Sequence, residues 1–376
     1  MKAIGILAIS ALIAVACSTG GSASSSSRTG TGSPSPAANP ADSKAADLRV
    51  RLDLLLGEHV ILVAKQAVAA SNHTDEYPGY LALLSANGSS LSDLMRAAFG
   101  NTAANQFDQA WGIQNGYLID YTIGLVTHND SKSNGAMSGL MNGFAPRFVQ
   151  LITSLTSLPL DSVKALETTQ LAMTTTTIDE VIAQSHTQMY ADLRRAYAND
   201  SKMGDAIAYQ VAKQFPDKFP GDPSTKAVDA RASLNTLLQE HVYVTTMMSD
   251  AGIAGRGSEA ASALGAVAGV RSDLGPVISF LLGSAAKTQF DQLWGIRDAD
   301  LFGYANSNAS GERQWLTGPF VSQFSILTAV PAAAVRDQVL ATLRVMDDQR
   351  AKSLEQVARD DRAAAAAMQP IADHIR

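Results

Sequence analysis

The chain has 376 residues, of which 46% are hydrophobic, and a formal net charge of −6 at neutral pH. This length predicts about two domains, and the composition is that of a globular protein with a packed core. The acidic balance, without any cluster of lysine and arginine, argues against nucleic acid as a partner. A single cysteine excludes a disulfide within the chain and a cysteine-based zinc site.

Residues 1–16 have the pattern of a bacterial signal peptide. A lysine at the second position is followed by an apolar run that is too short for a membrane span of roughly 20 residues. Residues 14–16 (Ala-Val-Ala) precede Cys17 and resemble a lipobox, after which the cysteine receives a diacylglycerol and becomes the mature N-terminus. Leu is more usual at the first of these positions, and Ala-x-Ala also fits ordinary signal cleavage, so plain secretion stays open. We favour lipidation, because the one cysteine of the chain lies where a lipobox requires it.

Residues 17–44 are rich in serine, glycine and proline and contain almost no large apolar side chain. Such a segment cannot offset the entropy that folding would cost, so we expect a disordered tether behind the lipidated cysteine. Two acyl chains anchor a protein stably, whereas one does not. The sequence therefore predicts an extracytoplasmic protein that is lipid-anchored to the bacterial cell membrane.

The remainder of the chain repeats itself. Residues 55–60 recur as residues 237–242, with Glu-His at the centre of both segments. Residues 106–113 recur as residues 289–296, and both segments read Gln-Phe-Asp-Gln-x-Trp-Gly-Ile. Matches that follow one order through both halves indicate an internal duplication.

Both copies have the periodicity of amphipathic helices. Apolar residues recur every three to four positions, for example at Leu48, Leu52 and Leu55, and no stretch shows sustained strand alternation. Three prolines and a glycine between the copies end any helix there. We therefore predict an all-α protein of two tandem antiparallel helical bundles with five to six helices each. The expected boundaries are 45–215 for repeat 1, 216–225 for the linker and 226–376 for repeat 2.

Glu58-His59 and Glu240-His241 are the candidate site residues. A histidine on the apolar stripe of a core helix is costly to bury without a partner, and both copies place one at the same position. One interpretation is a metal ligand or a proton-handling residue inside each bundle. The other is a histidine hydrogen-bonded to a neighbouring helix, with the glutamate solvated or paired beside it. Adjacent helix residues project about 100° apart, so one metal cannot easily take both side chains, and the structural interpretation is favoured.

The chain also resembles a group of exported bacterial helical-repeat proteins, some of which are named after copper amine oxidase. The resemblance lies in Leu-x-Glu-His of the first helix, in Phe-x-x-Leu-Trp at residues 290–294, and in Asp-Tyr-Thr at residues 120–122. It covers nearly all of the chain after the tether and implies the repeated helical fold. It supplies no established activity, and the oxidase activity is not transferred.

The same resemblance implies further histidines on the middle helix and on the last two helices of each unit. Gln114 and Arg297 stand at the middle-helix positions, and Gln170 and Asn199 stand at the later positions of repeat 1. An amide is a poor substitute for imidazole with zinc, copper or iron. If the family binds a metal through those histidines, this chain has lost most of the ligands.

Catalytic signatures are weak in this sequence. Ser284 and Lys287 match Ser-x-x-Lys, but the companion motifs of β-lactamases are missing, as are His-Glu-x-x-His and phosphate-binding loops. We expect a non-enzymatic binding or structural module without a cofactor, which binds an unknown protein or small molecule in a groove between the bundles. The alternative is a metal- or cofactor-binding bundle that uses the Glu-His pair of each repeat. An enzyme with dispersed active-site residues also stays open.

Overall fold

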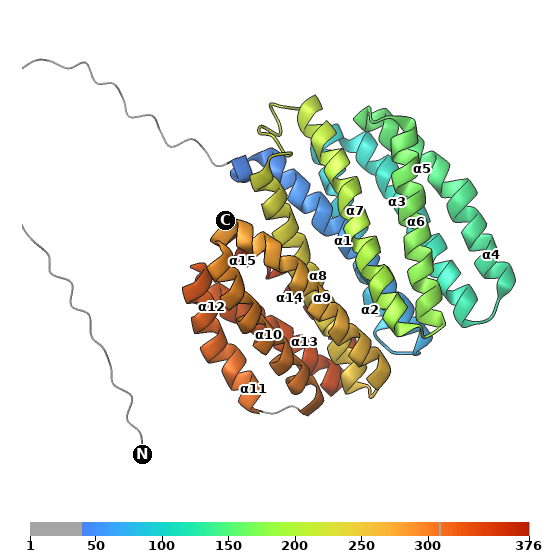
Figure 1. Ribbon diagram of the computed structural model, residues 1–376. Helices are drawn as coiled ribbons and strands as arrows, with labels where there is room; N and C mark the ends of the chain where they lie inside the picture. Colours follow the sequence, from blue (N-terminus) through green and yellow to red (C-terminus); the bar gives the residue numbers. More distant parts are fainter. Residues whose placement is uncertain (1–39, 308–309, 376) are drawn as a thin grey trace, which may run out of the picture. The chain divides into compact units, whose positions relative to one another are not determined.

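The computed structural model describes residues 40–307 and 310–375 (Figure 1). The predicted all-α class is confirmed, since this part of the chain is helical and contains no strand. The described residues form one compact unit. The predicted signal peptide, Cys17 and nearly all of the predicted tether lie outside the described residues, so these predictions are not tested by the structure.

The first half of the described chain begins with a short 3₁₀ turn and continues in long helices joined by short connections. Ser43 caps the first long helix, because its side chain accepts a hydrogen bond from the backbone N–H of Ala46 (3.2 Å). The elements are η1 (Pro40–Asp42), α1 (Lys44–Ser71), α2 (Tyr77–Phe99), α3 (Asn101–Val126), α4 (Asp130–Ser138), the π-helical η2 (Gly139–Phe144), α5 (Ala145–Thr156), α6 (Leu160–Ile182) and α7 (His186–Gln214).

The second half follows the same order of elements. Thr225 caps its first helix as Ser43 caps α1, by accepting from the backbone N–H of Val228 (3.3 Å). The elements are α8 (Lys226–Ile253), α9 (Gly257–Leu282), α10 (Ser284–Ser307), α11 (Ser310–Trp315), the π-helical η3 (Leu316–Phe320), α12 (Val321–Thr328), α13 (Ala332–Ala351), α14 (Leu354–Ala366) and α15 (Gln369–His374).

Short turns of the same kind divide both halves. Gly100 between α2 and α3 and Gly283 between α9 and α10 both have a φ of 89°, which a glycine adopts without the steric cost that a Cβ imposes. In each half a π-helical turn joins two α-helices into one continuous rod, α4–η2–α5 and α11–η3–α12. Counted in this way, the described part of each half has six long helices, with α15 as an additional short turn.

The core of each half contains a stack of aromatic rings. Phe107 stacks on Trp111 at a centroid distance of 5.3 Å in the first half, and Phe290 stacks on Trp294 at 4.9 Å in the second. All four side chains are buried. Because each phenylalanine precedes its tryptophan by four residues, both rings lie on the same side of α3 or α10 and fix that helix against the core.

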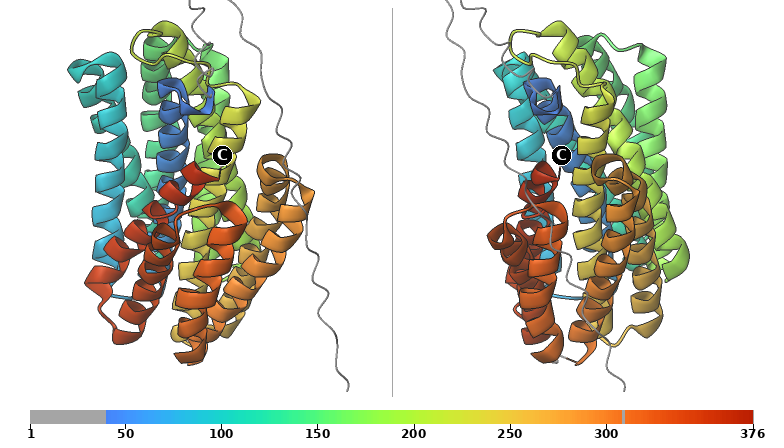
Figure 2. Two further views of the ribbon diagram at one scale, coloured as in Figure 1. Left: turned by 90° about the vertical axis from the view of Figure 1, so that its left-hand side faces the viewer. Right: turned by 60° about the vertical axis from the view of Figure 1, so that its left-hand side comes forward.

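Helices of the two halves pack directly against each other. The first helices of the halves, α1 and α8, are in contact at the centre of the unit (Figure 1). Around them α7 contacts α9, and α14 contacts α2, so the last long helix of each half packs against the second helix of the other. In Figure 2 most of the long helices of both halves run along one common direction. The two halves therefore share one extended interface.

Two helices of this unit, α1 and α9, are long and apolar enough to cross a membrane by length and composition alone. In α1 this property reflects its position in the core, since 83% of its most apolar window is buried against other helices. The same central position makes α1 the helix that presents the predicted site residues Glu58 and His59 to their surroundings.

Candidate functional site

Both candidate histidines are fully buried inside their own half of the protein. Nε2 of His59 lies 2.8 Å from Oδ1 of Asn115 on α3. Nε2 of His241 accepts a hydrogen bond from Nε1 of Trp294 on α10 at 3.0 Å, and Oδ1 of Asp298 on the same helix lies 2.9 Å from this nitrogen. Each imidazole therefore has a polar partner on the third helix of its own half. Burial lowers the pKa of His59 to about 4, so this ring is neutral at neutral pH.

The surroundings of the second histidine are charged, whereas those of the first are neutral. Burial lowers the pKa of His241, although the charge of Asp298 opposes this effect. Nη1 of the buried Arg297 lies 3.4 Å from Nδ1 of His241, and Nη1 of Arg271 lies 3.0 Å from Oδ2 of Asp298. Burial also lowers the pKa of Arg297, to about 10. The residue that replaces the expected histidine on α10 thus contributes a cation, which disfavours a metal ion at this position.

Glu58 points away from His59 and toward the other half of the protein. Its carboxylate accepts hydrogen bonds from both Nε (3.0 Å) and Nη2 (2.9 Å) of Arg362 on α14. Tyr243 on α8 donates its hydroxyl to the same carboxylate at 2.7 Å, and Asn87 on α2 donates its amide at 2.8 Å. Four donated hydrogen bonds therefore hold this buried carboxylate at the interface between the halves.

Glu240 makes the reciprocal contact from the second half to the first. Nε of Arg194 on α7 donates to its Oε1 at 2.9 Å, and Nη2 of the same arginine donates to Asp273 on α9 at 2.6 Å. Burial raises the pKa of Glu240 to about 7, although the charge of Arg194 opposes this effect. The Glu and His of each predicted pair therefore face different surroundings, in agreement with the angle between adjacent helix residues.

A metal centre built from the two pairs is not assembled in the described structure. Glu58 and Glu240 lie at the interface of the halves, and His59 and His241 lie inside separate halves. Within residues 40–307 and 310–375, no group of three or more His, Cys, Asp or Glu side chains is placed to hold a metal ion.

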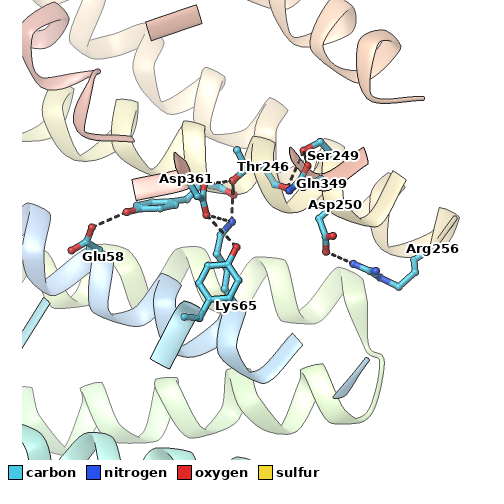
Figure 3. A network of polar contacts seen from close by, with 10 residues as sticks. Glu58, Lys65, Thr246, Ser249, Asp250, Arg256, Gln349 and Asp361 are labelled. Carbon is cyan, nitrogen blue, oxygen red and sulfur yellow. Dashed lines mark hydrogen bonds and ion pairs between the residues drawn. The ribbon is translucent and has the colours of Figure 1, made fainter. Parts of the chain in front are cut away.

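A buried ion pair, which the sequence analysis does not single out, crosses the same interface (Figure 3). Nζ of Lys65 on α1 lies 2.6 Å from Oδ2 of Asp361 on α14, and both side chains are almost fully buried. Thr246 on α8 donates its hydroxyl to Oδ1 of Asp361 at 2.7 Å and accepts from Nζ of Lys65 at 2.9 Å. A single polar network thus joins helices of both halves. The sequence does carry a signal for it, because Lys65, together with Gln66, interrupts the otherwise apolar residues 60–70 of a core helix.

Three of the four positions where the family resemblance implies histidines lie inside the first half, and the fourth, Arg297, lies inside the second. Gln114, Gln170 and Asn199 are all buried, and Nε2 of Gln114 donates to Oε1 of Gln170 at 3.0 Å. Two acids that the sequence analysis does not identify, Glu167 and Asp200, are buried there as well. Burial raises the pKa of Glu167 to about 8, with a smaller contribution from the neighbouring Asp200, and burial raises the pKa of Asp200 well above its ordinary value as well. The interior of this half therefore holds a polar cluster rather than a purely apolar core.

A cavity of about 200 Å³ lies beside the Glu58–Arg362 ion pair. Its walls come from α1 and α2 of the first half and from α8, α14 and the start of α15 of the second. Arg51 is an exposed residue of the lining, so the cavity reaches solvent, whereas Asn235 is a buried one. This is the position at which a groove between the repeats is predicted. Of the four predicted site residues, Glu58 alone lines the cavity.

Protein-family models, curated proteins and solved structures were compared with the chain, and none matches it. The resemblance to exported bacterial helical-repeat proteins therefore stays a prediction.

Proposed function

We propose that the chain is a lipid-anchored, non-enzymatic binding module outside the bacterial cell membrane, in which two duplicated helical repeats enclose a small-molecule site. The signal-peptide pattern, Cys17 and the residues of the tether support the anchor. The cavity beside Glu58 and Arg362 supports the binding role, because pockets commonly form where two structural units meet.

The reciprocal contacts between the halves support the duplication. Glu58 of the first half pairs with Arg362 of the second, and Glu240 of the second pairs with Arg194 of the first. The two glutamates belong to the repeated Glu-His segments, and each arginine lies nine residues after the serine that precedes its helix. Two copies of one repeat that pack around a local two-fold axis would make contacts of this kind.

The chemistry around the cavity supports binding rather than catalysis. The carboxylate of Glu58 already accepts four hydrogen bonds, which leaves it poorly placed to take a proton from a ligand. The two buried histidines do not belong to the lining. The cavity thus offers charge and hydrogen bonds that are fixed by neighbouring side chains, as a specific binding site requires.

The binding role can be tested by a thermal-shift screen of the full-length chain, purified in detergent, against small acids, amines, sugars and peptides. A ligand of the cavity raises the melting temperature by mass action. Ala365→Tyr fills the cavity with a ring and should remove the shift. If no compound of any class gives a shift that Ala365→Tyr removes, the proposed function is wrong.

The anchor can be tested by cell fractionation. Cys17→Ala removes the thiol that would receive the lipid, so we expect the protein to move from the membrane fraction to the soluble fraction or the medium. Ser18→Ala, next to it, should leave the distribution unchanged. Retention of the Cys17→Ala protein on the membrane at the wild-type level would refute lipidation.

A further inference from the structure

We infer that the cavity binds a small carboxylate that carries a hydrogen-bond donor, such as a short amino acid or hydroxy acid. This inference rests on the proposed binding function and names the class of its ligand. It follows from a comparison of the two arginines that cross the interface between the halves, which occupy corresponding positions but have different partners.

Arg194 has two carboxylate partners. Its Nε donates to Glu240 and its Nη2 donates to Asp273 on the other half. Arg362 has one, because both its Nε and its Nη2 donate to Glu58. Nη1 of Arg362 has no hydrogen-bond partner in the described part of the chain, and the side chain is 26% exposed. The guanidinium of Arg362 therefore keeps donors free for a further anion.

Arg362 lacks a second carboxylate partner because of one residue on α2. Asp273 lies ten residues before Gly283, which ends α9, and Ser90 lies ten residues before Gly100, which ends α2. Ser90 thus occupies on α2 the position that Asp273 occupies on α9. Its hydroxyl donates to the backbone of its own helix and supplies no charge. Ser90 belongs to the lining of the cavity, so the position of the missing carboxylate is open to a ligand.

The cavity also results from a difference in side-chain size between the two halves. Tyr197 on α7 lies twelve residues after Ser185, and Ala365 on α14 lies twelve residues after Ser353. The ring of Tyr197 fills the interface so closely that a Cβ on Gly57 would lie 2.6 Å from it. Ala365 has no ring and lines the cavity instead. One side of the interface is therefore filled by a side chain, and the other is open.

Charge and polarity in the cavity select the ligand. The charge of Arg362 balances that of Glu58, and Arg51 adds a positive charge to the lining and has no ion-pair partner among the described residues. Asn235 lines the cavity and is buried, and its Nδ2 donates to the backbone of its own helix while its Oδ1 has no hydrogen-bond partner. A buried carbonyl oxygen without a donor is unfavourable, so a ligand N–H or O–H group would stabilise it once the Asn235 side chain turns this oxygen toward the cavity.

The volume limits the size of this ligand. Pockets for drug-sized molecules are about 300–1,000 Å³, whereas this cavity is about 200 Å³. A short 2-amino or 2-hydroxy acid carries the carboxylate and the donor on adjacent carbons and has a suitable size. A long-chain acid, a nucleotide or a peptide is too large to enter completely.

The test compares acids with their uncharged analogues on the full-length chain in detergent, by calorimetry and thermal shift. Alanine and lactate supply both groups, alaninamide and lactamide lack the carboxylate, and propionate lacks the donor. We expect alanine and lactate to bind and the two amides to bind at least about tenfold more weakly. The affinity of propionate should lie between those of the acids and the amides.

A substitution that supplies the missing carboxylate distinguishes this site from any other. Ser90→Asp reproduces on α2 the arrangement of Asp273, so it should fold and should weaken binding of the acids at least about tenfold. Ser89→Asp adds the same charge to the neighbouring exposed position and should leave binding unchanged.

The outcomes separate this inference from the proposed function. If compounds without a carboxylate bind as tightly as the acids and Ala365→Tyr removes their binding, the ligand class is wrong and the binding module stands. If the acids bind equally well to the Ser90→Asp and wild-type proteins, the inference is wrong for this cavity. If no compound of any class binds in a way that Ala365→Tyr removes, both proposals fail.

Discussion

Lys65→Met is expected to lower the free energy of unfolding by about 3–5 kcal/mol, because it leaves the carboxylate of Asp361 buried without its cation. Both side chains of this pair are almost completely buried, and their charged atoms lie 2.6 Å apart. Replacing both partners removes the isolated charge, so the double variant Lys65→Met with Asp361→Leu should recover most of the lost stability. Urea-induced unfolding followed by circular dichroism measures both effects.

An exposed ion pair of the same protein provides the control. Lys132 pairs with Asp120, and the side chains of both residues are more than one third exposed. Lys132→Met should therefore change the free energy of unfolding by less than about 1 kcal/mol. Equal losses for Lys65→Met and Lys132→Met would contradict the assignment of the Lys65–Asp361 pair as a buried link between the halves.

The second large effect is a decrease in stability as the pH rises from 6.5 to 8, which Glu167→Gln should reduce. Burial raises the pKa of Glu167 from the ordinary 4.5 to about 8 in the folded protein. Between these values the folded protein holds a proton that the unfolded chain has lost, so raising the pH favours unfolding. One such group contributes a slope of up to about 1.4 kcal/mol per pH unit.

The lower limit of this pH window follows from His59. Its pKa falls from 6.5 to about 4 in the folded protein, so between these values the unfolded chain holds the extra proton. Raising the pH through that range therefore increases stability and opposes the effect of Glu167. Above pH 6.5 this opposition ends.

Urea unfolding at several pH values between 6.5 and 8 measures the slope. Burial also raises the pKa of Glu76 to about 8 and that of Glu240 to about 7, and it raises the pKa values of Asp53 and Asp200 well above their ordinary range, so these four groups contribute to the wild-type slope. Glu167→Gln should therefore reduce the slope without abolishing it. Glu355→Gln, at an exposed position, should leave it unchanged. An unchanged slope in the Glu167→Gln protein would mean that this carboxyl is ionised in the fold.

The helical class and the inward position of the histidines could be predicted because they depend on local periodicity. His59 lies seven residues after Leu52, which places both side chains on the same side of α1, and both are buried. The break between α7 and α8 is equally local, because the prolines of this segment disrupt helices wherever the rest of the chain lies. Information of this kind is contained within a few turns of one helix.

The partners of the glutamates could not be predicted in the same way. Glu58 and Arg362 are far apart in the chain, and their contact depends on how α14 of the second half packs beside α2 of the first. The periodicity of the sequence does not predict which helices pack together. The sequence does not indicate that Glu167 is buried either, because an acid in a polar stretch of a helix has the pattern of a solvent-exposed residue. The cavity is harder still to predict, since it results from a side chain that is small, Ala365, where the other half has a large one.

The exchange of contacts between the halves has a consequence for the history of this protein. If both halves descend from one repeat, that repeat could have satisfied its buried glutamate only by pairing with a second copy of itself, as a symmetric homodimer. Such a dimer would have had two identical recesses beside its arginines. Fusion of the two genes would have released each recess from the need to match the other. One could then be closed by Tyr197, while the other stayed vacant beside Arg362.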